Sequence, residues 1–177
     1  MTGHPEFINA TRPGGRSLYA PLHQAAYGGA PAAVMQTLIE LGAWRTLQNA
    51  LGERPVDIAE KRRRDALILT PRSKRHVPLG TLLNIQSHFH AVIRGRAAKQ
   101  IEHYELRLPE LEPLLEIEQG PIWFPVPGMA GGFSYDLVAE GAQAKLESKS
   151  WCRIVAGSGE RHEITAGGSR LVEEGFV

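Results

Sequence analysis

The sequence is poor in cysteine and in aromatic residues, and it contains no long apolar run. Its single cysteine, Cys152, excludes a disulfide within the chain. No segment approaches the roughly 18 consecutive apolar residues that predict a membrane-spanning helix. The first residues also lack the basic and apolar regions of a secretory signal. We therefore expect a cytoplasmic protein that does not interact with a membrane.

Composition allows an ordinary globular protein. The chain has 177 residues, 42% of them hydrophobic, and its formal net charge is only +1. This is enough apolar material for one good core or two small ones, and nothing in it favours disorder or a fibre. The oligomeric state is not indicated.

Two similar segments, residues 20–26 and 54–59, open the first half of the chain. Pro21 and Pro55 hold equivalent places in them, 34 residues apart. Proline suits the first position of a helix, because its missing N–H would have no partner within the helix and its fixed φ already matches the helix. Each segment therefore predicts the start of a helix, and Gly42 between them can end a second helix in a left-handed conformation.

Together with the run at 41–52, these segments resemble ankyrin repeats, whose usual period is about 33 residues. The resemblance covers about residues 15–70, as one complete repeat and one partial repeat. It implies helical hairpins joined by an extended finger, and a protein that binds a protein partner without catalysis. It also implies that the ring of His23 bonds the backbone of the neighbouring repeat and binds no ligand.

The chain departs from the ankyrin pattern at its helix starts and at its end. Ala20 and Arg54 stand where the family has a capping threonine, which removes about 1 kcal/mol of stabilisation from each helix. Other groups must therefore hold these helices. The second copy stops at Pro71 and, because about three stacked repeats are needed to bury a continuous core, the remainder of the chain must cap the stack.

The resemblance implies that the finger and the exposed side of the first helix contact the partner. Trp44 is the expected anchor, because aromatic side chains often dominate interface energies. The alternative is that Trp44 folds back over other parts of the chain. Asn49 and Gly52 are expected to shape the finger. The expected contact residues are Trp44, Arg45, Thr46, Gln48, Leu51, Gln24 and Tyr27.

Two blocks of opposite charge lie in the middle of the chain. Seven basic residues and one acid lie between Lys61 and His76, whereas six acids and one arginine lie between Glu102 and Glu118. A basic cluster can bind a phosphate backbone, and nucleic-acid binding through residues 61–76 is one hypothesis. No readout motif accompanies the charge, however, and a solvated face or contact with the acidic block explains it equally. We do not expect nucleic acid as the partner.

Residues 78–177 predict a second, α+β domain. Apolar residues at helical spacing predict a helix over 81–94, with Thr81 as its N-cap and Gly95 as an interruption, and weaker helical spacing continues to about 108. Short β-prone segments then alternate with turn residues. The predicted strands are 121–126, 132–138, 145–155, 161–165 and 170–172.

These strands predict an antiparallel meander of four or five strands, with hairpin loops at 140–141, 157–159 and 167–168. Phe133, Tyr135 and Leu137 should share its core face, and Pro125 places the first strand at an edge. The predicted fold class is therefore α+β. A truncated ankyrin stack with a basic linker occupies 1–77, and a helix-capped sheet domain occupies 78–177, with helices at about 81–108 and the sheet at about 121–177.

Candidate catalytic and metal-binding patterns are weak. His88 and His90 would lie about 200° apart around a helix and could not share one ion, although on a strand they could. Ser158 and His162 would lie about 13 Å apart on a strand, too far for a nucleophile and its base. We therefore expect no catalytic residues, no metal and no cofactor, and the sequence leaves open whether the second domain is an enzyme.

The alternative function is that the second domain binds or transforms a small molecule while the repeats support it. A polar pocket would then combine aromatic and basic side chains of the sheet. A solvated sheet face with cross-strand pairs is the other interpretation of the same residues. The candidate pocket residues are Trp123, Tyr135, Arg153, Arg161 and His162.

Overall fold

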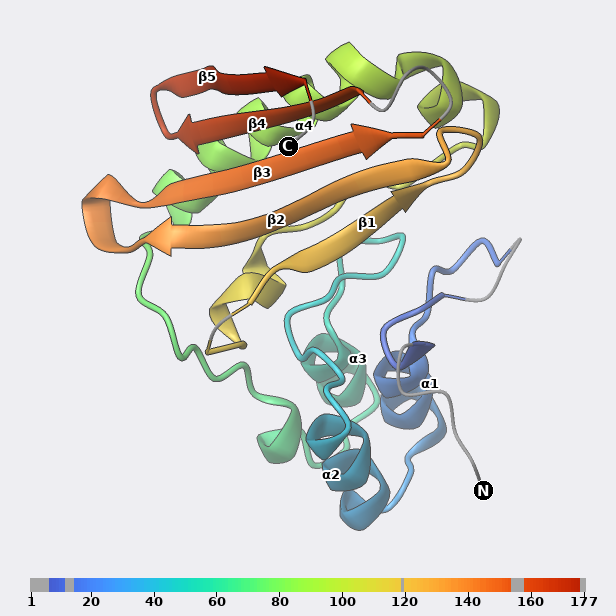
Figure 1. Cartoon of the computed structure of the whole chain (residues 1–177). Coiled ribbons are helices and arrows are strands. Elements are labelled where there is room, and N and C mark those ends of the chain that lie inside the picture. Colours follow the sequence, from blue (N-terminus) through green and yellow to red (C-terminus); the bar gives the residue numbers. More distant parts are fainter. Residues whose placement is uncertain (1–6, 12–14, 119, 154–157, 176–177) are drawn as a thin grey trace. The chain divides into compact units, whose positions relative to one another are not determined.

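A computed structural model describes residues 7–11, 15–118, 120–153 and 158–175 of the chain (Figure 1). The chain divides into two compact units, residues 1–73 and 74–177. The described residues form four α-helices and one five-stranded antiparallel sheet, which confirms the α+β class and the helix that precedes the meander. The boundary lies four residues before the expected one, because Lys74 and Arg75 bond to the second unit.

The first unit contains helices α1 (Pro21–Gly28), α2 (Ala32–Glu40) and α3 (Pro55–Lys61) and the 3-10 turn η2 (Leu67–Leu69). Small side chains in its core let the helices approach closely. Gly29 ends α1 in the left-handed region with φ 71°, and the Arg64 guanidinium packs so closely on it that a Cβ would clash. The buried apolar residues that form its core cluster are Leu22, Ala26, Met35, Ala43, Ile58, Ala59 and Leu69.

Matching polar contacts hold the starts of α1 and α3, where the capping threonines are missing. The Ala20 N–H donates to Nδ1 of His23 over 3.3 Å, and the Arg54 N–H donates to Oδ2 of Asp57 over 2.7 Å. In both helices, therefore, the side chain of the third helical residue accepts a hydrogen bond from the backbone N–H of the residue that precedes the helix. This is one half of a capping box, which keeps an otherwise orphaned donor satisfied.

The second unit begins with α4 (Leu79–His103), a helix longer than the sequence predicts. It begins after Pro78, two residues before the expected cap Thr81, and it continues through Gly95. The interruption predicted at Gly95 is wrong, since the non-helical backbone lies at Ala97 (φ −133°, ψ 26°). A helical glycine costs stability without ending the helix, so neighbouring packing can carry α4 through it.

The sheet follows chain order from β1 to β5, and every neighbouring pair is antiparallel. Figure 1 shows α4 lying along one face of it. Phe89 of α4 contacts this face, with its ring centroid 4.9 Å from that of Tyr135 and 6.4 Å from that of Phe133. The strands are β1 (Ile122–Val126), β2 (Gly131–Ala139), β3 (Lys145–Cys152), β4 (Ser158–Thr165) and β5 (Gly168–Gly175), with 3-10 turns η3 (Glu112–Leu115) and η4 (Gly141–Gln143).

Alternation along β2 places its apolar residues as predicted. Phe133, Tyr135 and Leu137 are all buried on the helix-facing side. Pro125 lies in β1, an edge strand, as the sequence indicates. Ser158 and Gly159, expected in a hairpin loop, instead begin β4, while Val155 and Gly157 lie outside the described residues.

Arg75 anchors the start of the second unit. Its side chain is only 5% exposed and pairs with Asp136 over 2.7 Å. The guanidinium also donates to the carbonyl oxygens of Ile117, Glu118 and Leu137 over 3.0 to 3.2 Å. Lys74 pairs with Glu118 over 3.1 Å. The end of the basic segment is therefore bound to the end of the acidic segment.

Candidate functional site

The finger between α2 and α3 is organised around Asn49, which is buried. Its Oδ1 accepts the N–H groups of Leu51 (2.8 Å) and Glu53 (2.9 Å), and its N–H donates to the carbonyl of Glu53 over 2.8 Å. Gly52 completes the turn with φ 76°. The turn is therefore fixed by side-chain contacts to its own backbone.

The turn also contacts α1 through His23, whose side chain is buried. Nε2 of His23 donates to the carbonyl of Glu53 over 3.3 Å, while its Nδ1 accepts the Ala20 N–H. In the neutral imidazole, these two contacts correspond to the tautomer with the proton on Nε2. His23 thus joins the start of α1 to the turn before α3, and both ring nitrogens are used within the unit.

The expected partner-binding residues differ widely in exposure. Leu51 is 81% exposed and Tyr27 is 47% exposed, and Gln24 is exposed on α1. Thr46 is only 5% exposed, so its side chain adds to the interior of the finger and offers little contact surface.

The remaining finger residues are half-buried. The Trp44 N–H donates to Oδ1 of Asn9 over 2.9 Å, and Nε of Arg45 donates to the carbonyl of Ile68 over 3.1 Å. Gln48 is also half-buried. These three side chains are therefore only partly accessible, whereas Leu51 is almost fully exposed.

The aromatic rings of His23, Tyr19 and Tyr27 contact one another in that order. The Tyr19 ring stacks on His23 with centroids 5.6 Å apart and meets the Tyr27 ring edge-on at 5.9 Å. The Arg62 guanidinium lies over Tyr27, 3.6 Å from the ring centroid. Cation–π contact of this kind holds an exposed tyrosine in one orientation.

Other basic side chains of residues 61–76 also have partners within the first unit. Lys61 forms a hydrogen-bonded ion pair with Glu53, and this contact holds the pKa of Glu53 below its usual value. Nη1 of Arg64 donates to the carbonyls of Ala26 (3.1 Å) and Tyr27 (2.7 Å) at the end of α1. Much of this basic cluster is therefore used to hold the fold.

The structure does not bring the five predicted pocket residues together. Tyr135 and His162 lie on the helix-facing side of the sheet, in register with Ser148 between them. Trp123 and Arg161 lie on the opposite side, and Arg153 is exposed after the end of β3. The pocket prediction is wrong because the residues have opposite parity along their strands, and successive side chains of a strand point to opposite faces.

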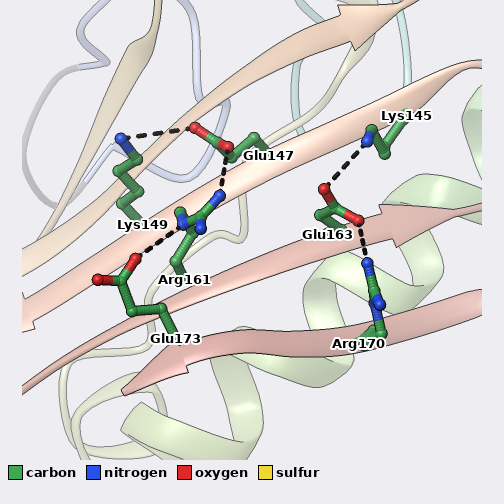
Figure 2. Close-up of polar contacts among 7 residues, drawn as sticks. All are labelled: Lys145, Glu147, Lys149, Arg161, Glu163, Arg170 and Glu173. Carbon is green, nitrogen blue, oxygen red and sulfur yellow. Dashed lines mark hydrogen bonds and ion pairs between the residues drawn. The ribbon is translucent and has the colours of Figure 1, made fainter. Parts of the chain in front are cut away.

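The side of the sheet away from α4 carries ion pairs, one within β3 and the others between neighbouring strands, shown in Figure 2. One row contains Lys149–Glu147 (3.5 Å), Glu147–Arg161 (3.2 Å) and Arg161–Glu173 (3.1 Å). The other joins Glu163 to Lys145 (3.0 Å) and to Arg170 (2.7 Å), which keeps the pKa of Glu163 low. Arg161 thus has a structural role here.

Two tryptophans lie on the same side of the sheet. The Trp123 and Trp151 rings stack with centroids 4.4 Å apart and planes 20° from parallel, and both remain partly exposed. The Trp123 ring extends across Gly132, where a Cβ would lie 2.9 Å from its atoms. Gly132 therefore leaves room for the stacked pair.

A groove of about 330 Å³ lies between α4 and the strands β4 and β5. Arg96 pairs there with Glu160, and its Nη2 donates to the carbonyl of Ser158 over 2.7 Å. Nε2 of His162 lies 3.9 Å from Oε2 of Glu160, and burial lowers the pKa of His162. The lining residues are Ala91, Val92, Gly95, Arg96, Glu160, His162 and Ser169.

Sequence reasoning identifies only His162 among these groove residues. Arg96 and Glu160 are 64 positions apart, and no local pattern indicates that they form a pair. The one available signal is the alternation of β4, which places Glu160 and His162 on one face.

The histidines considered for metal binding lie on a helix. His88 and His90 both belong to α4, and Nε2 of His90 donates to the carbonyl of Pro109 over 2.8 Å. Burial lowers the pKa of His90. Among the residues that the structure describes, no three His, Cys, Asp or Glu side chains gather into a possible metal site.

Within the same described residues, no helix has the length and apolar character needed to cross a bilayer. Comparison of the chain with protein-family models, with curated proteins and with solved structures finds no match.

Proposed function

We propose that the first unit is a truncated ankyrin-type module that binds a protein partner through its finger and the exposed side of α1. The repeated helix starts support the repeat. Ala20 and His23 of the first copy make the same contact as Arg54 and Asp57 of the second copy, 34 residues later. The His23 contact to the finger also has the form that the ankyrin resemblance implies.

The exposure of Leu51 on a fixed turn is the observation that carries this proposal. An 81% exposed leucine has no role in the core of the unit. Asn49 holds the backbone N–H groups of Leu51 itself and of Glu53, so little conformational freedom would be lost on binding. A preorganised apolar side chain of this kind can serve as an anchor in a pocket of a partner.

Tyr27 extends the proposed surface from the finger along α1. Contacts from Glu53 through His23 and Tyr19 connect the two regions on one side of the helix. Exposed tyrosine with a neighbouring arginine is a common composition of protein interfaces. We therefore assign Leu51, Tyr27 and Gln24 to the centre of the surface and Trp44, Arg45 and Gln48 to its border.

Nucleic-acid binding by the basic segment has less support. Lys61, Arg62, Arg64, Lys74 and Arg75 all have partners within the chain. A phosphate backbone would have to compete with these contacts. A protein partner needs no such rearrangement.

The proposal can be tested by capturing partners from host lysate on immobilised protein. The wild type is compared with a Leu51→Asp, Tyr27→Ala variant and with a control, Leu67→Asp, which changes a 75% exposed leucine of the same unit outside the proposed surface. A partner retained by the wild type and the control but lost by the double variant would support the proposal. Equal retention by all three proteins, with unchanged circular dichroism, would refute it.

A further inference from the structure

We propose that the groove between α4 and the strands β4 and β5 binds a small uncharged molecule with an amide-type edge, meaning a carbonyl beside an N–H. The site is separate from the protein-binding surface proposed for the first unit. Its volume is about 330 Å³, and α4 supplies an apolar wall of Ala91 and Val92. The polar groups come from Arg96 of the helix and from Glu160, His162 and Ser169 of the strands.

Gly95 is the first reason to regard the groove as a binding site. Glycine within a helix is less favourable than alanine, and no backbone or packing constraint among the described residues requires it here. A Cβ at Gly95 would meet no atom within 4 Å, and its φ is not in the left-handed region. What the missing side chain provides is open space at the wall of the groove.

An unsatisfied polar atom is the second reason. Nη1 and Nη2 of Arg96 bond to Glu160 and to Ser158, but Nε is buried without a hydrogen-bond partner among the described residues. The hydroxyl of Ser150 is also buried without such a partner, and Ser150 lies opposite Glu160 in the sheet. Buried polar groups are nearly always satisfied in native proteins, so the unpaired Nε of Arg96, a residue that lines the groove, indicates a missing partner; Ser150 lies behind Glu160 and does not line the groove.

The charges of the groove select an uncharged ligand. Arg96 and Glu160 neutralise each other, and the lowered pKa of His162 keeps its imidazole neutral near pH 7. A carboxylate placed at Arg96 would meet the carboxylate of Glu160, and an ammonium group would meet the guanidinium of Arg96. A neutral carbonyl can accept from Arg96 while the adjacent N–H donates to Glu160, His162 or Ser169.

The apolar wall defines the rest of the ligand. Ala91, Val92 and Gly95 present no polar side chain to the groove, and all three residues are small. A planar ring attached to the amide-type edge would cover this wall and remove apolar surface from water. Benzamide has both parts and serves as a probe, and benzoate and benzylammonium provide its charged counterparts.

The test uses the full chain labelled with ¹⁵N and titrated with each probe. Benzamide is expected to cause saturable shifts in the amide signals of Gly95, Arg96, His162 and Ser169. Benzoate and benzylammonium are expected to bind at least tenfold more weakly. Comparable affinity for all three probes, or no saturable shift with benzamide, would overturn the proposal.

Two glycine variants separate the groove from general effects on the helix. Gly95→Leu fills the groove and is expected to weaken benzamide binding at least tenfold. Gly80→Leu is the matched control, because Gly80 also lies in α4 and a Cβ added there would also meet no atom within 4 Å. Equal loss of binding in both variants, or retention in both, would contradict the assignment. Unfolding curves of the two variants confirm that each is folded.

Discussion

The two units of the chain are stabilised by different kinds of interaction. Among the described residues, the first has a core cluster of seven buried apolar residues, three of them alanine, and it depends on polar side chains that bond the backbone at turns and helix starts. The second has sixteen buried apolar residues, counted over the described part of the chain, in one cluster between a helix and a sheet. A few polar contacts therefore define the first unit, whereas continuous apolar packing defines the second.

The largest effect should come from the core of the second unit. Phe133 is fully buried against Phe89 and Phe124, so Phe133→Ala is expected to lower the free energy of unfolding by about 3 to 5 kcal/mol. Val138→Ala on the same strand changes an exposed side chain and is the control. Denaturant unfolding followed by tryptophan fluorescence measures both. A loss for Phe133→Ala no greater than that for Val138→Ala would contradict the assigned core.

In the first unit, the polar side chain of Asn49 is expected to contribute strongly to stability. Asn49→Ala removes the acceptor of two backbone N–H groups in the finger and is expected to destabilise this unit by about 2 kcal/mol. Gln24→Ala, which is exposed on α1, is the control. Hydrogen exchange at Leu51 and Glu53 gives the local measurement. Unchanged protection there would show that Asn49 does not hold the turn.

Acid should weaken the second unit through its partly buried histidines. The pKa values of His90 and His162 are lowered in the folded chain, so below about pH 6.5 the unfolded chain binds protons that the folded chain does not. The free energy of unfolding therefore falls as the pH decreases through this range. His90→Gln keeps a donor for the Pro109 carbonyl but does not titrate, and it should reduce the pH dependence.

Thermal unfolding between pH 7.5 and 5.5 measures this dependence. The exposed His103 lies at the end of the same helix, and His103→Gln is the control. If the wild type and His90→Gln lose the same stability on acidification, the assignment of His90 is incorrect.

The smallest effect is expected on the open face of the sheet. The Arg170 side chain is 74% exposed and, in the part of the chain that the structure describes, pairs only with Glu163, so the water around it screens the ion pair. Arg170→Ala should change the melting temperature less than any variant above. A shift as large as that of Asn49→Ala would show that the cross-strand ion pairs contribute more than solvent screening allows.

Features set by neighbouring residues could be predicted from the sequence, whereas features set by contacts between distant segments could not. Phe133, Tyr135 and Leu137 are correctly predicted in the core, because alternation along a strand is a local property. The proline-led helix starts at Pro21 and Pro55 are also local and correct. The predicted pocket fails because it joins residues of both faces, and deciding the face requires the register of four strands.

The groove could not be predicted from the sequence for a related reason. Arg96 and Glu160 become neighbours only when α4 crosses the sheet, and neither residue stands out in its own segment. In the sequence Gly95 indicates only a helix interruption, because a glycine alone does not reveal the space around it.

The Arg75 anchor has a consequence for the order of folding. Its acceptors lie 42 to 62 positions further along the chain, at the end of the acidic segment and in β2. The guanidinium can leave water only when both acceptor segments are already in place, so we expect this contact to close after the main barrier to folding. Arg75→Met should therefore speed unfolding while leaving the refolding rate nearly unchanged. The residue that begins the second unit in the sequence is then among the last to reach its native position.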